Sequence, residues 1–209
     1  TITSGKDKGI AINSVKCKMT ISGNTIKKCK AYPIYCNPAS TSYAITLKKN
    51  IITGNSKKID GIRADSGKLI LSSNTISSCS RAIILSSKVK GTVYPNTFKK
   101  NTYNNVKVNS SYVNTLTVKS LSGKSKSAKT ATLNWKKLSS ASGYVVYRSA
   151  SKNGSYTKIS TIKKNKTITY KDSKLKRKST YYYKIVPYTT IGKTTVYGLD
   201  SKIVSIKIK

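Results

Sequence analysis

Four asparagines recur at a nearly constant spacing in the first half of this sequence. Asn24, Asn50, Asn74 and Asn96 lie 26, 24 and 22 residues apart, and each opens a near-copy of one phrase: NTIKKC, NIITGN, NTISSC and NTFKKN. In every copy a large apolar residue follows the Asn by two positions, and another precedes it by three. A fixed period of about 20 to 50 residues indicates a repeat architecture, so it constrains the fold more than local propensity does.

Each repeat holds three short apolar pieces separated by polar turns, which suits short strands better than an amphipathic helix. One turn of a parallel β-coil per repeat satisfies the pattern, with successive coils about 4.8 Å apart. Stacked Asn amides would then bond from coil to coil, and Asn itself would take the left-handed conformation of a sharp corner. The alternative, that Asn is simply common in turns, explains one Asn well and four in phase badly.

A second stack is expected five positions after each Asn, where small or amide residues recur: Cys29, Asn55, Cys79 and Asn101. Cys29 and Cys79 would lie two coils apart, about 9.6 Å from the strand spacing, which is too far for a disulfide. The pairing and redox state of the four cysteines otherwise stay open. The sequence has no His and no CxxC pair, so we expect neither a zinc site nor a Cys–His nucleophile, and no metal or cofactor.

These units resemble the right-handed parallel β-helix proteins of the pectate-lyase-like superfamily and their bacterial surface relatives. The resemblance covers roughly Thr1 to Asn109, and we expect the domain to span residues 1–113 with about four or five coils. The residues Thr1-Ile2-Thr3 match the phrase that follows an Asn. We therefore expect these coils to be the C-terminal part of a longer helix, with an export signal upstream.

The second half has the pattern of an antiparallel sandwich, with strands expected at 132–135, 143–148, 156–162, 167–171, 180–189 and 202–209. Asn153-Gly154 is a strong hairpin signal. Residues 114–209 resemble a fibronectin type III domain through Trp135, Tyr144, Val146, Tyr147, Leu175 and Tyr181. The resemblance implies that Trp135 is the central core residue, that Tyr181 forms a tyrosine corner, and that Tyr183 and Ile185 point inward.

The predicted fold class is therefore all-β: a right-handed parallel β-helix followed by an immunoglobulin-like (fibronectin type III) β-sandwich. The family's usual Pro and Gly before the corner Tyr are Arg177 and Lys178 here, so the turn departs from the pattern. We expect this domain to act as a spacer or stalk.

The charge of the chain is extreme, with 41 Lys and Arg against 5 acidic residues and a net charge of +36. Such a field favours polyanions. The lysines are scattered over turns and outward positions, whereas a nucleic-acid binder concentrates cations on one face. We therefore expect an acidic or neutral polysaccharide or a cell-envelope polymer as partner, and no specific nucleic acid. The sequence has no apolar run long enough for a membrane span, and we expect a secreted or cell-surface monomer.

One predicted strand of each coil carries the candidate site. The residues expected to face solvent from it are Ala11, Tyr35, Arg63, Ile84 and Lys107, and those expected to line its approach are Lys8, Tyr32, Asp60, Arg81 and Asn104. The resemblance implies that polysaccharide binds on this face. The best candidates for sugar contact are Tyr32, Tyr35, Asp60, Arg63 and Arg81, because aromatic faces pack on sugar rings and Arg recognises carboxylates. The alternative is that Asp60 and Arg81 form an exposed cross-strand pair of little energetic weight.

Catalysis has weaker support, and we name no catalytic residue. Asp65 falls in a second predicted corner stack with Asn13, Asn37, Ser86 and Asn109, which favours a structural hydrogen-bonding role. Calcium requires several carboxylates, and glycoside hydrolysis requires two flanking ones. The main hypothesis is thus an adhesive or binding protein of the envelope. The alternative is the C-terminal part of a polysaccharide lyase or glycoside hydrolase whose active site lies mostly upstream.

Overall fold

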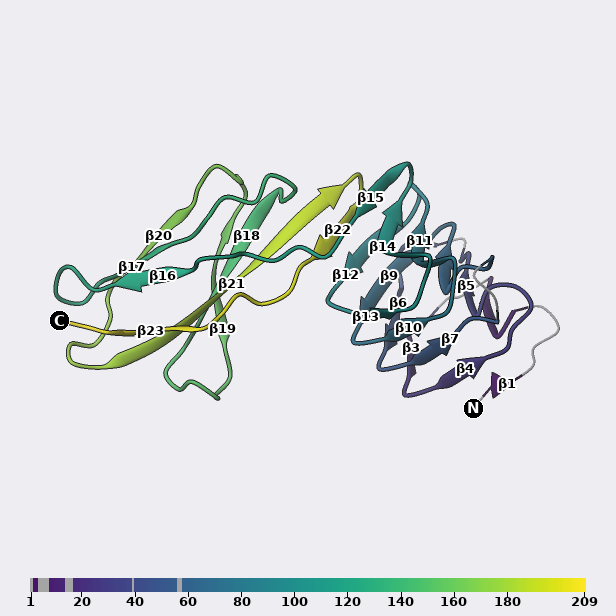
Figure 1. The fold of residues 1–209 in the computed structure, drawn as a ribbon, viewed down its shortest axis with the longest axis horizontal. Helices are drawn as coiled ribbons and strands as arrows, with labels where there is room; N and C mark the ends of the chain where they lie inside the picture. Colours follow the sequence, from purple (N-terminus) through teal and green to yellow (C-terminus); the bar gives the residue numbers. More distant parts are fainter. Residues whose placement is uncertain (1, 4–7, 14–16, 39, 56–57) are drawn as a thin grey trace. The chain divides into compact units, whose positions relative to one another are not determined.

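The computed structural model describes residues 2–3, 8–13, 17–38, 40–55 and 58–209, and all regular structure in these ranges is β-strand. The chain divides into two compact units, one comprising Thr1–Asn114 with Thr190–Val196, the other Thr115–Thr189 with Tyr197–Lys209. Within the described ranges, no helix offers a long apolar stretch that could cross a bilayer. Figure 1 shows the strands of both units.

Three sheets build the first unit, and successive coils contribute successive parallel strands to each; β15, at the end of the second sheet, is antiparallel. The first sheet runs β1 (Ile2–Thr3), β4 (Thr25–Lys27), β7 (Ile51–Thr53), β10 (Thr75–Ser77) and β13 (Thr97–Lys99). The second runs β2 (Ile10–Ile12), β5 (Ile34–Cys36), β8 (Ile62–Ala64), β11 (Arg81–Leu85), β14 (Tyr103–Val108) and β15 (Ser111–Val113). The third contains β3 (Met19–Ser22), β6 (Ala44–Lys48), β9 (Lys68–Ser72), β12 (Lys90–Val93) and β22 (Thr194–Tyr197). The unit is thus a right-handed parallel β-helix, which confirms the predicted fold class.

Aliphatic side chains at equal positions of successive coils fill the interior of this helix. Ile26, Ile52 and Ile76 are paired in register and fully buried. The second and third sheets contribute further buried residues in the same way, among them Ile34, Ile62, Ile83, Leu47 and Leu71. Burial of each such side chain stabilises the fold by about 1.5 to 3 kcal/mol.

The asparagine ladder is present as the spacing predicts. Asn50 donates both its backbone N–H and its Nδ2 to Oδ1 of Asn74, each at 3.0 Å, and Asn74 makes the same pair of bonds to Asn96 at 2.9 Å. Asn24 bonds Asn50 likewise, at 3.0 and 3.2 Å. The predicted left-handed Asn is wrong: that conformation belongs to the residue before it, at Gly23, Lys49 and Ser73.

The second predicted stack is only partly formed. Cys79 donates its backbone N–H to Oδ1 of Asn101 at 2.9 Å, but the side chain of Asn55 is exposed and the stack is interrupted there. A Cβ on Gly54 would lie 2.8 Å from Sγ of Cys79 and 2.4 Å from the Ser78 oxygen. Cys79 therefore packs over the bare backbone of Gly54, and Asn55 is left outside the column.

The last coils end differently from the repeat. Strand β15 turns back and pairs antiparallel with β14, while β22 pairs in parallel with β12. Thr194, which is fully buried, donates to the Val89 oxygen and accepts the N–H of Gly91. We expected all residues from 114 onward to belong to the second domain. The segment Thr190–Val196 corrects this expectation, because it forms part of the first unit.

The second unit is the expected sandwich. One sheet contains β16 (Ser122–Lys124), β17 (Ala131–Asn134) and β20 (Thr169–Asp172), with β16 absent from the sequence prediction. The other contains β18 (Gly143–Ser149), β19 (Thr157–Ile162), β21 (Thr180–Ile191) and β23 (Val204–Lys207), all paired antiparallel. Most predicted strands differ from these by a few residues at either end.

The sandwich core follows the predicted pattern. Trp135 is buried and meets Tyr144 edge to face, with ring centroids 5.3 Å apart, while Tyr183 and Ile185 are fully buried. The tyrosine corner is formed, because the Tyr181 hydroxyl accepts the N–H of Lys176 at 3.2 Å. Lys178 adopts φ of 60° where the family has its usual Gly, a conformation that costs an ordinary residue about 1 to 2 kcal/mol.

We expect the ladder to be worth a large share of the stability of the β-helix. In Asn74→Ala, the Asn50 donors, the Leu47 oxygen and Asn96 lose a buried partner. The free energy of unfolding should fall by about 3 kcal/mol, since each unsatisfied buried group costs about 1 to 3 kcal/mol. Urea unfolding followed by far-UV circular dichroism measures the change.

Asn24→Ala is the matched control, because among the described residues the Asn24 carboxamide only donates, to Ser22 and Asn50. Oδ1 of Asn50 still receives the backbone N–H of residue 24. The free energy of unfolding of Asn24→Ala should therefore fall by only about 1 kcal/mol. Equal losses for the two variants would contradict a cooperative ladder.

Candidate binding face on the second sheet

The outer face of the second sheet gathers the candidate residues. The inward side chains of β5, β8 and β11 are buried, so the residues between them point to solvent. Strand pairing aligns these outward residues in one row: Ala11, Tyr35, Arg63, Ile84, Lys107 and Tyr112. Tyr32, Asp60, Arg81 and Tyr103 lie beside this row. We call the eight polar and aromatic members the Tyr/Arg face: Tyr32, Tyr35, Asp60, Arg63, Arg81, Tyr103, Lys107 and Tyr112.

One half of the face is tied together by direct hydrogen bonds. Arg63 Nε donates to Asp65 Oδ1 at 3.1 Å, and Nη1 donates to the Tyr32 hydroxyl at 3.2 Å. The Tyr35 hydroxyl donates to the other oxygen of Asp65 at 2.9 Å. The rings of Tyr32 and Tyr35 are stacked with centroids 5.9 Å apart. This half is therefore a fixed aromatic platform with its arginine already paired.

Asp65 acts on this platform through its carboxylate, although it occupies the predicted corner stack. The hydrogen bond to Asp65, followed by burial, raises the pKa of the Tyr35 hydroxyl, so this Tyr stays neutral. Asp65 was expected to hydrogen-bond within the corner stack. Its carboxylate instead accepts hydrogen bonds from Tyr35 and Arg63 and so orients two residues of the face.

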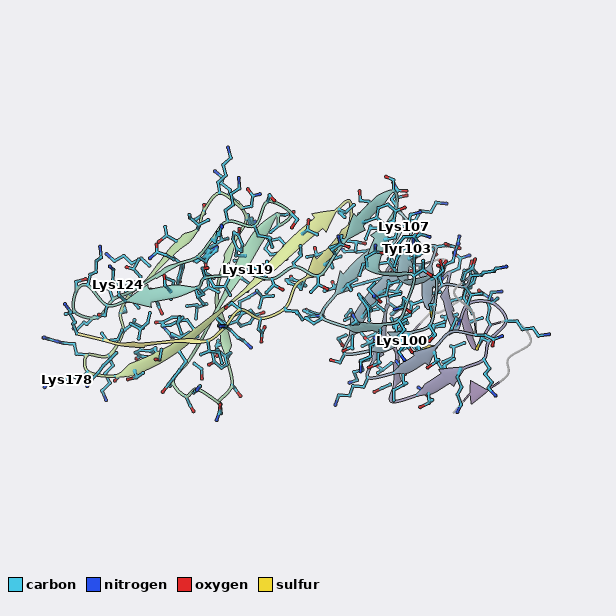
Figure 2. All side chains as sticks on the ribbon, in the orientation of Figure 1. Lys100, Tyr103, Lys107, Lys119, Lys124 and Lys178 are labelled. Atoms are coloured by element: carbon cyan, nitrogen blue, oxygen red, sulfur yellow. The ribbon has the colours of Figure 1, made fainter. Side chains whose placement is uncertain are left out.

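The other half of the face is held by ring contacts. The Arg81 guanidinium lies 4.6 Å from the ring centre of Tyr103 and 5.7 Å from that of Tyr112. Lys107 Nζ lies 5.6 Å from the ring centre of Tyr112. Both tyrosines are about half exposed, and Figure 2 labels Tyr103 and Lys107 close together in β14. These groups thus present aromatic surface and positive charge together.

Asp60 meets Arg81 through the backbone. Its Oδ1 accepts the Arg81 N–H at 3.3 Å, and within the described part of the chain no ion pair joins the two side chains. Burial raises the pKa of the Asp60 carboxyl, against the opposing effect of this bond and of Arg81. The expected alternative of a simple cross-strand ion pair is therefore not what the structure shows.

The sequence named five residues of this face, and the structure brings all five onto it. It missed two. Asn104 was expected beside the strand, but a bulge in β14 aligns Arg81 with Tyr103 and Ile83 with Val106, so Tyr103 takes that place. Tyr112 lies on the antiparallel strand β15, outside the repeat, and no periodic signal could find it.

Charge elsewhere on the molecule forms a coat. Every lysine in the described ranges is exposed or half-buried. Nitrogen-tipped side chains project from the ribbon of each unit, including those of Lys100 and Lys178 (Figure 2). Cations also lie against tyrosine rings in the second unit, where Arg148 contacts Tyr181 and Lys184 contacts Tyr147 and Tyr156. The Tyr/Arg face differs from the coat because strand pairing places its cations and rings in a row on one sheet.

These observations define a right-handed parallel β-helix protein with a row of aromatic and cationic side chains on one sheet. The family model described as "Periplasmic copper-binding protein (NosD)" matches residues 1–134, and the chain belongs to this family. Comparison with curated proteins gave no match.

Solved structures resemble the chain over a part of its length. A fibronectin type III-like protein from Clostridium thermocellum is 29% identical, covering 43% of this chain and 88% of that one, with a TM-score of 0.38. The FN1–FN3 domains of chicken CNTN1 are 17% identical, and the match covers 50% of this chain and 35% of that one, with a TM-score of 0.40. The sixth fibronectin type III domain of human fibronectin type III domain containing protein 3 is 19% identical. That match covers 46% of this chain and 87% of that one, with a TM-score of 0.38.

The residues of this chain do not fit the copper of the family description. Copper is bound in proteins by imidazole, thiolate and thioether groups, and this sequence has no His and a single Met. Burial raises the pKa of the Cys36 and Cys79 thiols to about 12, which disfavours the thiolate that a metal needs. In the described part of the chain, no three His, Cys, Asp or Glu side chains lie together.

We expect the protein to retain no stoichiometric copper. After incubation with excess Cu(II), or with Cu(I) under reductant, and gel filtration, mass spectrometry should find copper well below one atom per chain. Cys17 is the exposed thiol, so Cys17→Ser should abolish any remainder. One tightly held copper per chain in Cys17→Ser would contradict this account.

Proposed function

We propose that this chain is an exported envelope protein whose β-helix binds carbohydrate or another envelope polymer through the Tyr/Arg face, with the sandwich as a spacer. The observation that carries the proposal is the register that places aromatic and cationic side chains side by side across the second sheet. The family's description as periplasmic supports the location.

The dimensions of the face suit a chain-like ligand. Six outward positions at the strand spacing extend over about 24 Å, which is longer than one small molecule needs. The stacked, partly exposed rings of Tyr32 and Tyr35 begin an aromatic row, and the half-exposed rings of Tyr103 and Tyr112 continue it beyond Arg63. A polymer lying across the strands would meet these groups in succession.

Binding without turnover is supported by the state of the two carboxylates near the face. Asp65 already accepts hydrogen bonds from Tyr35 and Arg63, and Asp60 accepts one from the Arg81 backbone. Each is therefore engaged in holding the face together. We propose a recognition surface and assign no catalytic residue.

The experiment compares wild type with Tyr35→Ala/Arg63→Ala on a glycan array and in pull-downs with bacterial cell walls at about 0.15 M salt, where the Debye length is about 8 Å. The control, Tyr43→Ala/Lys48→Ala, also removes one exposed Tyr and one cation from the β-helix but lies off the second sheet. We expect retention to fall at least about tenfold in the first variant, since polar and aromatic contacts contribute about 1 to 2 kcal/mol each.

The control should keep wild-type retention within about twofold, because a single exposed charge contributes little at this ionic strength. Absence of retention by wild type on every glycan and wall preparation would refute the proposal. Equal losses in the two double variants would refute it as well, since charge alone would then account for binding.

A further inference from the structure

We propose that Arg81 is the anion-recognition point of the Tyr/Arg face, where its guanidinium binds a carboxylate or sulfate group carried by the polymer. This inference rests on the proposed function and adds a ligand class to it, an acidic glycan. The Arg81 side chain lies between the rings of Tyr103 and Tyr112, with Lys107 beside Tyr112.

The two arginines of the face differ in what occupies their donors. Arg63 already bonds Asp65 and the Tyr32 hydroxyl, so two of its donors are used within the protein. For Arg81, no side-chain hydrogen bond or ion pair is formed with the described residues, and its Nε is buried without a partner. A guanidinium has five N–H donors and strongly favours having them satisfied. Because Nε is buried, the two terminal Nη groups of Arg81 are the donors that remain for a ligand.

The flanking rings fix the direction of these donors. Cation–π contacts with the two tyrosines hold the guanidinium, and of its nitrogens only Nε is buried without a partner. A planar fork held in this way matches the two oxygens of a carboxylate or sulfate in bidentate fashion. The exposed parts of the same rings, 47% of Tyr103 and 54% of Tyr112, can pack on the sugar that carries the anion.

The local charge agrees with an anionic ligand. Arg81, Arg63 and Lys107 all act electrostatically on Asp60, whose carboxylate accepts the Arg81 backbone N–H. Asp65 is paired with Arg63. Among the residues of the Tyr/Arg face, Arg81 and Lys107 together carry two positive charges against the single carboxylate of Asp60.

A general attraction of polyanions to the lysine coat must be separated from recognition at one point. Dextran, carboxymethyl dextran and dextran sulfate allow this separation, because they share one backbone and differ in the anionic group that it carries. The variants are Arg81→Gln, which removes the charge; Arg81→Lys, which keeps the charge and loses the fork; and Lys178→Gln, which removes one exposed cation from the other unit. Dissociation constants are measured by biolayer interferometry at about 0.15 M salt, where exposed charges are largely screened.

We expect Arg81→Gln to weaken binding to carboxymethyl dextran, dextran sulfate or both by about tenfold, since a hydrogen bond to a charged group contributes about 1.5 to 3 kcal/mol. Arg81→Lys should lose about threefold or more, and Lys178→Gln less than about twofold. Unchanged urea unfolding of Arg81→Lys shows that the effect is not a folding defect. The anion whose binding responds identifies the group that Arg81 takes.

Equal losses in Arg81→Gln and Lys178→Gln would overturn the inference, and so would an Arg81→Lys variant that binds like wild type. A loss seen only with single-stranded DNA as the probe would also overturn it, because stacked bases on a basic face would then be the ligand class. In each case the proposed function stands or falls separately, on the retention of Tyr35→Ala/Arg63→Ala on glycans and cell walls.

Discussion

The hydrogen bond from one asparagine to the next is the interaction on which the β-helix depends. In each step a single Oδ1 accepts both the backbone N–H and the Nδ2 of the Asn one coil earlier, as between Asn50 and Asn74. Nδ2 also donates to a carbonyl of a neighbouring coil, for example from Asn74 to Leu47. A shift of one residue would break all these bonds and turn the buried side chains outward. The ladder therefore fixes the register of every coil.

The Tyr/Arg face is a consequence of that register. Tyr35 and Arg63 are almost thirty residues apart in sequence, yet strand pairing sets them side by side. The same pairing joins β8 to β11 and β11 to β14, so two arginines and several tyrosines meet on one sheet. The two halves then diverge: Arg63 donates to Asp65 and to the Tyr32 hydroxyl, while the Arg81 guanidinium contacts the rings of Tyr103 and Tyr112. This difference in hydrogen bonding is the basis for the proposal that Arg81 recognises an anion.

Sequence reasoning reached the fold because the signals were periodic. The Asn spacing predicted the ladder and the inward aliphatic columns, and the pattern around Trp135 and Tyr181 predicted the sandwich. It failed where a coil departs from the period. Gly54 allowed Cys79 to pack closely and excluded Asn55 from its stack, and a bulge in β14 replaced Asn104 by Tyr103. Two further parts of the β-helix, Tyr112 and the segment Thr190–Val196, pair with it through strands outside the repeat. No local sequence pattern predicts these pairings.

Amide hydrogen exchange at the asparagines tests the ladder most directly. The backbone N–H groups of Asn50 and Asn74 follow left-handed turn residues, but here one is bonded to Oδ1 of the buried Asn74 and the other to Oδ1 of the half-buried Asn96. The account predicts that both exchange as slowly as the strand amides of Ile52 and Ile76, because opening them requires the coils to separate. Exchange of these two amides at the rate of exposed loops would contradict the ladder, and with it the register that assembles the Tyr/Arg face.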